Sequence, residues 1–271
     1  SFLSSIKKNK FFYSINLLGF LTGFLVLIVI FTFVYQELNF DKFHEKAENI
    51  YRINSGGYGV TPLCFGEKLH NTIPEISNIV RFSSDEITIV KNNELLKPKK
   101  VYYTDSCVFK VFTFNLLKGN IKNVLKDPYS VVISKSLSEQ LFGDSSSVGN
   151  FIKSKSGLIL KVTGIMEDIP VTSHLKCDLF ASIETLRSLD ENAFSCGSWG
   201  NLTYLLLESN SVTKSVEEKI NTLLEDFRME TSDGKIQLKL QSIPQLYFDY
   251  SSNKYDGCEH GSILVTIIYA T

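Results

Sequence analysis

The sequence predicts an α+β protein that begins with a membrane-spanning helix. Two observations carry this prediction. The run from Phe11 to Gln36 contains no charged residue, and after it the chain alternates short strand-like and helix-like stretches separated by polar turns. The 271 residues have a formal net charge of −1, so the charge balance gives no indication of a nucleic-acid-binding surface.

The apolar run is long enough to cross a bilayer. At about 1.5 Å per residue it spans a hydrocarbon core of about 30 Å. A cleaved secretory signal has a shorter apolar part that ends in small residues, whereas this run ends in bulky residues such as Phe33 and Tyr35. Lysines precede the run and acidic residues follow it. The positive-inside rule therefore places residues 1–10 in the cytoplasm, residues 11–36 in the membrane and the following domain outside the cytoplasm.

Two further features concern the membrane. Gly19 and Gly23 form a G-x-x-x-G pair, the spacing at which two membrane helices approach closely, so we expect a helix-packing contact there. The alternative is that glycine is simply frequent in such helices. Residues 262–271 are apolar again, and we interpret residues 251–271 as a stalk and the start of a second membrane helix. A short buried strand would have the same pattern.

Residues 37–48 are predicted to continue as a stalk helix, on which two sets of residues follow the helical repeat. The polar set comprises Glu37, Asp41, His44 and Glu48. The apolar set comprises Phe40, Phe43, Ala47 and Ile50. The polar set has side chains that bind metal ions, but one exposed helix would supply them all. We therefore favour a helix with one wet side, whose apolar set couples the stalk to the rest of the protein.

The remaining chain reads as a mixed α+β domain. We expect strands over 49–55, 76–84, 86–90, 99–105, 130–134, 158–169, 176–183, 202–209 and 235–243. We expect helices over 61–73, capped by Thr61, over 135–142, ended by Gly143, and over 211–227, where an apolar face recurs at helical spacing.

Two stretches are similar to known functional motifs, one for nucleotide binding and one for cysteine proteases, but neither motif is complete. The stretch SGGYGVTP lies between a strand and a helix, but Pro62 stands where a dinucleotide fingerprint needs glycine and no G-K-[ST] follows. The stretch SCGSWG around Cys196 is similar to a papain-type motif, but Trp199 stands where the second cysteine belongs. We expect a plain turn at the first motif, and at the second a turn at a strand edge with Trp199 packed in the core.

The other candidate residues also give no catalytic site. The five cysteines are Cys64, Cys107, Cys177, Cys196 and Cys258, and none forms a C-x-x-C pair. We expect most of them to be buried as small apolar residues. One disulfide among them is the alternative that the sequence leaves open. Glu167 and Asp168 are adjacent, so on a strand they would point to opposite faces. Cys258 to His260 reads as a loop near the membrane. We therefore expect no enzyme activity, no cofactor and no metal.

Several segments together resemble the periplasmic core domain of MacB-like and FtsX-like ABC transporter permeases, in particular those with two repeats from Bacteroidetes. The segments are INLLGFLTG, QELNFDKFHEKAENIYRIN, YYTDSCVFKVFTFNLLKGNIKNVLKDPYSVVISKSLSEQLFG, KVTGIMEDIPVTSHLKCDLFASIETL and SWGNLTYLLLE. Ser147 stands where the family often has proline, and Val171 and Thr172 replace more usual residues.

The resemblance implies a two-lobed periplasmic domain. A porter-like lobe would comprise residues 49–100 and 173–250, and residues 101–172 would form an inserted second lobe. It also implies a permease subunit in the bacterial inner membrane whose periplasmic domain is moved by ATP hydrolysis on a separate cytoplasmic ATPase. A second permease copy or homologue, and membrane lipid, would be its other partners. The rival interpretation is a membrane-anchored sensor or binding domain without transport activity.

Overall fold

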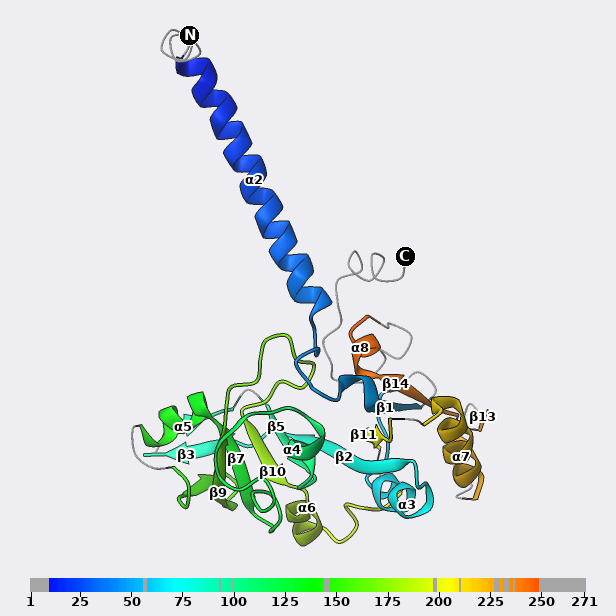
Figure 1. Ribbon diagram of the computed structural model, residues 1–271. Coiled ribbons are helices and arrows are strands. Elements are labelled where there is room, and N and C mark those ends of the chain that lie inside the picture. Colours follow the sequence, from blue (N-terminus) through cyan, green and yellow to red (C-terminus); the bar gives the residue numbers. More distant parts are fainter. Residues whose placement is uncertain are drawn as a thin grey trace.

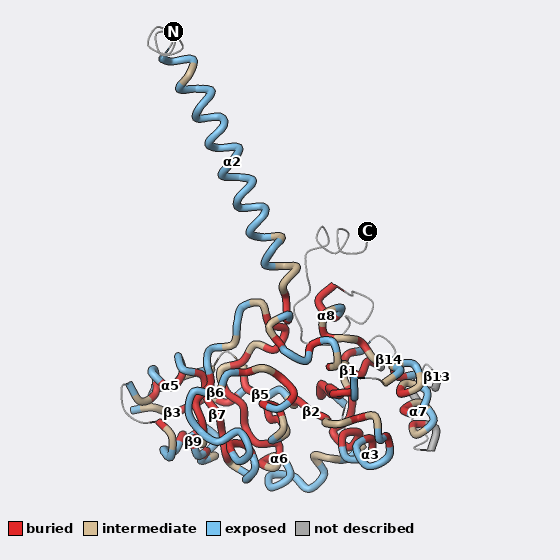
Figure 2. The backbone as a smooth tube through the Cα atoms, viewed as in Figure 1, coloured by how far each residue is buried: buried red, intermediate tan, exposed pale blue. Residues whose placement is uncertain are grey.

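The computed structural model describes residues 10–55, 58–92, 94–98, 100–143, 147–196, 199–209, 211–226, 230–231, 234–235 and 237–248. Its first helix, α2 (Lys10–Leu38), projects from the domain and has no buried residue (Figures 1 and 2). Within the described part of the chain it is the one helix long and apolar enough to cross a membrane. A helix that is apolar on all sides needs an apolar surrounding, which a bilayer provides. This agrees with the predicted membrane helix.

The rest of the described chain is built on one sheet of twelve strands. Its order is β14-β1-β11-β2-β5-β10-β7-β9-β8-β3-β4, with β6 paired to β9. The strands are β1 (Ile50–Ser55), β2 (Ile76–Asp85), β3 (Ile89–Lys91), β4 (Glu94–Leu96), β5 (Val101–Thr104), β6 (Leu116–Lys118), β7 (Ser130–Ser134), β8 (Phe151–Ser154), β9 (Ile159–Met166), β10 (Leu179–Ser182), β11 (Leu202–Leu207) and β14 (Leu238–Ser242). A separate ribbon pairs β12 (Glu230–Thr231) with β13 (Gly234–Lys235).

The sheet curls strongly over the strands from β5 to β3. Residues 86–88 alone connect β2 to β3, and such a connection reaches at most about 14 Å. Six strand spacings separate β2 from β3 along the sheet, about 29 Å if the sheet were flat. The strands from β5 to β3 must therefore wrap around, and an apolar core that includes Ile89, Val131 and Val162 fills the space they enclose.

Helices cover the two ends of the sheet. The α-helices are α3 (Cys64–Thr72), α4 (Val108–Val111), α5 (Lys135–Phe142), α6 (Glu184–Leu189), α7 (Thr213–Asp226) and α8 (Ile243–Leu246), and η1 (Ala47–Asn49) is a 3₁₀ turn. Helices α3 and α7 lie at one end, and α5 lies with β3 at the other (Figure 1). Residues from α3 and α7 share a core with β1, β2 and β11, while an aromatic core around Phe82, Phe112 and Phe180 fills the middle.

Most predicted elements are confirmed, and the exceptions have physical causes. Helix α3 begins at Cys64 and not after Thr61, because Thr61 forms a β-bridge with Asn201 and its hydroxyl lies 2.7 Å from that of Thr203. The sheet is continuous across the two predicted lobe boundaries: β3 pairs with β8 on one side and with β4 on the other, and β10 pairs with β7. The division into lobes at residues 100 and 172 stays a prediction.

Candidate functional site at the exit of the membrane helix

The membrane helix continues into a turn, residues 39–46, that is fixed to the domain. Beyond Leu38 the helix cannot continue, because the backbone N–H of Asp41 donates to the carbonyl of Thr172 at 2.8 Å and not to a helical carbonyl. Asp41 has φ 57°, a left-handed conformation that aspartate tolerates better than most residues. The predicted stalk helix over 37–48 is therefore wrong beyond Leu38.

Asp41 begins a buried chain of polar contacts. One carboxylate oxygen accepts from the backbone N–H of His174 at 3.0 Å, and the other lies 2.8 Å from His174 Nδ1. His174 Nε2 lies 2.8 Å from the hydroxyl of Tyr204, and all three residues are buried. The contact between His174 Nδ1 and Asp41 is close but not aligned as a hydrogen bond, whereas His174 Nε2 and the Tyr204 hydroxyl share a hydrogen bond whose direction follows the imidazole tautomer. Because Tyr204 belongs to β11, the contacts run from the turn after α2 to an interior strand of the sheet.

A second buried imidazole, that of His44, lies in the turn itself. Its Nδ1 accepts from the backbone N–H of Thr113 at 3.1 Å, and its ring lies edge-to-face with Phe112 and Phe114. The Nε2 atom is buried without a hydrogen-bond partner among the described residues. Burial in this aromatic surrounding, with a smaller effect of His174, lowers the pKa of His44 from 6.5 to about 4. His44 is therefore neutral at pH 7.

The lowered pKa of His44 predicts an acid-sensitive turn. The folded protein binds the His44 proton less readily than the unfolded chain, so stability falls as the pH drops from about 6.5 to about 4. A pKa shift of this size corresponds to a loss of roughly 3 kcal/mol in the free energy of unfolding over this pH range. We expect His44→Asn, which keeps an acceptor for Thr113, to show a weaker loss of stability over this range in denaturant titrations. Carboxylates titrate in both proteins, so equal pH dependence would contradict the prediction.

An apolar contact joins the turn to the last described helix. Phe40 is buried, and its ring stacks on Tyr247, directly after α8, with 3.6 Å between ring centroids. The Tyr247 hydroxyl donates to Glu37 at 2.8 Å, from the last turn of α2. The last turn of α2 and the turn that follows it therefore both contact Tyr247, near the end of the described domain.

The two sets of residues predicted on the stalk have different outcomes. The apolar set lies inward: Phe40, Ala47 and Ile50 are buried, and Phe43 packs partly buried against the aromatic core. The polar set is not a wet helix face. Asp41 and His44 are buried, and only Glu48 is exposed. Among the described residues no group of three or more histidine, cysteine, aspartate or glutamate side chains is arranged to hold a metal ion.

The comparisons with known proteins identify the family. The family model of the MacB-like periplasmic core domain matches residues 14–223. The chain belongs to this family. No curated protein matches it in sequence.

Solved structures show the same fold at 16% sequence identity. A domain of a protein named as a permease from Porphyromonas gingivalis superposes with a TM-score of 0.60, covering 73% of this chain and 92% of that one. The periplasmic region of MacB from Actinobacillus actinomycetemcomitans gives 0.55, with 73% and 90% covered. The extracellular domain of the ABC-type transporter YknZ from Gram-positive bacteria gives 0.53, with 71% and 100% covered.

In this MacB-like domain the structure brings together segments that the sequence could only place in order. Asp41 and His174 are 133 positions apart in the chain, and Tyr204 lies in a third segment. Sequence reasoning selected Asp41 for its helical spacing and did not select His174, Tyr204 or Tyr247. The signal that could have found His174 is the presence of two polar residues, Ser173 and His174, in a segment that leads into a buried strand.

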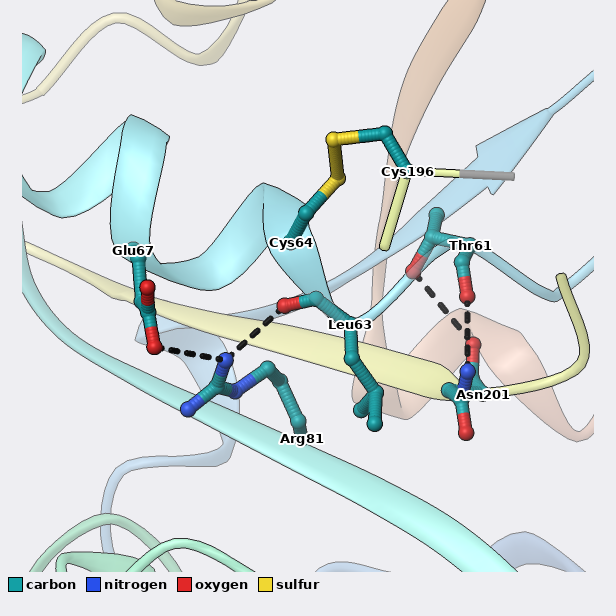
Figure 3. Close-up of a disulfide and its surroundings, with 7 residues drawn as sticks. All are labelled: Thr61, Leu63, Cys64, Glu67, Arg81, Cys196 and Asn201. Atoms are coloured by element: carbon teal, nitrogen blue, oxygen red, sulfur yellow. Dashed lines mark hydrogen bonds and ion pairs between the residues drawn. A yellow bond between two sulfur atoms is a disulfide. The ribbon is translucent and has the colours of Figure 1, made fainter. Parts of the chain in front are cut away.

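The MacB-like domain also contains a disulfide, between Cys64 at the start of α3 and Cys196 in the loop before β11 (Figure 3). Beside it, Arg81 donates to both oxygens of Asp105, with Nη2 to Oδ1 at 2.6 Å, and to the carbonyl of Leu63 at 2.8 Å. The loop that carries Cys196 also presents Phe194, whose ring lies 5.0 Å from the Arg81 guanidinium. The disulfide thus fixes a loop that covers a buried ion pair.

The other predicted sites have mixed outcomes. Trp199 is 38% exposed and meets Phe65 edge-to-face, so the prediction that it packs in the core is wrong. Glu167 and Asp168 lie just beyond β9 and not on the strand, and their carboxylates bond to different residues, Asn115 and Ser136. A methyl group added at Gly19 or Gly23 would meet no atom within 4 Å on the exposed α2, so their packing contact stays a prediction. Cys258 to His260 and residues 251–271 lie outside the described residues, as do residues 1–9.

Proposed function

We propose that this chain is the permease subunit of an ABC transporter whose extracytoplasmic domain is moved by ATP hydrolysis on a separate cytoplasmic ATPase. A second permease copy or homologue would complete the membrane part. The family supports a transporter component, and the chain carries no nucleotide-binding motif of its own. The chain needs no cofactor in this role, because ATP binds to the partner. The work done on the cargo would be export, lipoprotein extraction or mechanical signalling across the envelope.

The observation that carries this proposal is the connection at the exit of α2. A flexible tether would need no buried contacts, since it would only keep a domain near the membrane. Here Asp41 contacts His174 in the interior, and Phe40 stacks on Tyr247. A shift or rotation of α2 would therefore be transmitted to both segments, because packed groups resist deformation.

The disulfide supports the proposed orientation. Structural disulfides persist in oxidising compartments and are rare in the cytoplasm. The Cys64–Cys196 bridge lies in the domain after α2, so it favours an extracytoplasmic domain in the bacterial inner membrane, with residues 1–10 in the cytoplasm as the lysines also predict.

Replacing Phe40 tests the coupling. We expect Phe40→Ala to lose about 3 kcal/mol of local packing and to reduce the ATP-driven movement of the domain, measured by energy transfer between labels on the domain and the membrane in the complex with its ATPase. Phe151→Ala is the matched control, because Phe151 is 64% exposed on β8. Equal movement in both variants would contradict coupling through Phe40. A membrane complex that contains no ATPase would instead favour the sensor interpretation.

A further inference from the structure

The loop between β9 and β10 is held rigidly at the exit of α2. At its start the Asp168 carboxylate accepts from the backbone N–H of Ser136 at 3.1 Å and from its hydroxyl at 2.6 Å. In its middle the N–H of Ser173 donates to the carbonyl of Pro170 at 3.0 Å, which closes a tight turn. At its end His174 contacts Asp41, as described above. The conformation of the turn is therefore set by bonds on both sides.

This rigid loop exposes an aliphatic side chain at its tip. Val171 is 70% exposed, although it lies between Pro170 and Thr172 in the closed turn. Ile169, two residues earlier, packs instead against the aromatic core. A single exposed valine is ordinary on a soluble surface, so its position relative to the membrane decides what it contacts.

The position of the loop follows from the length of α2. The helix has 29 residues and is about 43 Å long, close to the roughly 40 to 45 Å of a bilayer with its headgroups. Tyr35, 62% exposed near the end of α2, fits the aromatic belt found at membrane interfaces. Leu38 therefore lies at headgroup depth, and the bond from Asp41 to Thr172 places the loop three residues beyond it. Figure 1 shows the segment between β9 and β10 rising toward the base of α2.

We propose that this loop rests on the bilayer and inserts Val171 among the lipid headgroups beside α2. The acidic side chains at the start of the loop are directed to the domain and not to the tip, because Asp168 bonds to Ser136 and Glu167 to Asn115. Lys42, exposed next to Asp41, supplies an ammonium group at the same level for lipid phosphates. The membrane would then contact the domain at two places, the helix and the loop, and a tilt of the domain on its helix would be restricted. This inference rests on the membrane anchor and not on transport.

The single tryptophan of the chain makes a direct test simple. Trp199→Phe removes the native signal, and Val171→Trp then places one reporter in the loop. Val212→Trp is the matched control, because Val212 is also a valine, 67% exposed, just before α7. Both proteins are reconstituted with the membrane helix into vesicles of phosphatidylethanolamine and phosphatidylglycerol, with and without lipids brominated near the headgroup end of the acyl chains.

The proposal expects the fluorescence of the Val171→Trp protein to shift to the blue and to be quenched by the brominated lipid, while the control shows neither change. Emission at the wavelength of water-exposed tryptophan, with no more quenching than the control, would overturn it. A blue shift without quenching would also overturn it, since the loop would then be covered by protein. A circular dichroism spectrum equal to that of the parent protein shows that each variant is folded.

Discussion

Replacing both Cys64 and Cys196 by serine is expected to lower the free energy of unfolding by about 3 to 5 kcal/mol. The two cysteines are 132 positions apart, and closing so long a loop in the unfolded chain is worth about 4 to 5 kcal/mol in the chain-entropy account. The bridge also fixes the loop whose Phe194 covers Arg81. Both effects act in the same direction, because releasing the loop exposes the ion pair between Arg81 and Asp105 to water.

The measurement is denaturant unfolding of the detergent-solubilised protein, followed by circular dichroism. Wild type with a reducing agent should approach the double variant, since both lack the bridge. Cys107→Ser is the control: this thiol is free, and burial, with a smaller effect of Asp105, raises its pKa to about 12, so it stays protonated. A double variant that unfolds within about 0.5 kcal/mol of wild type, the range of ordinary surface changes, would show that the bridge contributes little.

The sequence predicted most of the longer strands and helices. Alternating β-branched and aromatic residues predicted β1, β2, β5, β9, β10 and β11, and the helical repeat predicted α7, on which Val216, Ile220 and Leu224 are buried. The helix ending at Gly143 is confirmed too, with the N–H of Gly143 donating to the carbonyl of Glu139. These features depend on neighbours a few residues apart, which periodicity can detect.

The candidate site depends on partners far away in the chain, and periodicity cannot detect these. Residues 37–48 have a good helical repeat, yet Thr172 takes the N–H of Asp41 and ends the helix. The same repeat predicted that Asp41 and His44 face water, whereas His174 and Thr113 hold them inside. The pairing of Cys64 with Cys196 is of the same kind, because no spacing rule connects two cysteines across so long a loop.

Replacing Asp41 by alanine is expected to have the largest effect at the exit of α2. The change leaves the buried N–H of His174 without its acceptor and the His174 imidazole without its close contact, at about 1 to 3 kcal/mol for each buried group. It also forces alanine into the left-handed conformation that Asp41 adopts at φ 57°, for about 1 kcal/mol more. Asp41→Asn should be milder, because asparagine tolerates this backbone conformation and still accepts from the His174 N–H.

The asparagine variant retains a polar group beside the imidazole. If its amide donates to His174 Nδ1, the imidazole carries its proton on Nε2 and donates to the Tyr204 hydroxyl, so the polar contacts persist. We therefore expect Asp41→Asn to cost about 1 to 2 kcal/mol, well below Asp41→Ala, in denaturant titrations. Lys42→Ala, at the exposed neighbouring position, is the control and should stay within about 0.5 kcal/mol of wild type.

The same three variants separate stability from coupling. At a denaturant-free condition where all are folded, Asp41→Ala should also weaken the ATP-driven movement of the domain, because the turn after α2 has lost its contact with His174. A double-mutant cycle with His174→Ala should be strongly non-additive, since both residues act through one contact. Additive losses, or normal movement in folded Asp41→Ala, would mean that α2 transmits its motion through the contact of Phe40 with Tyr247 and not through Asp41.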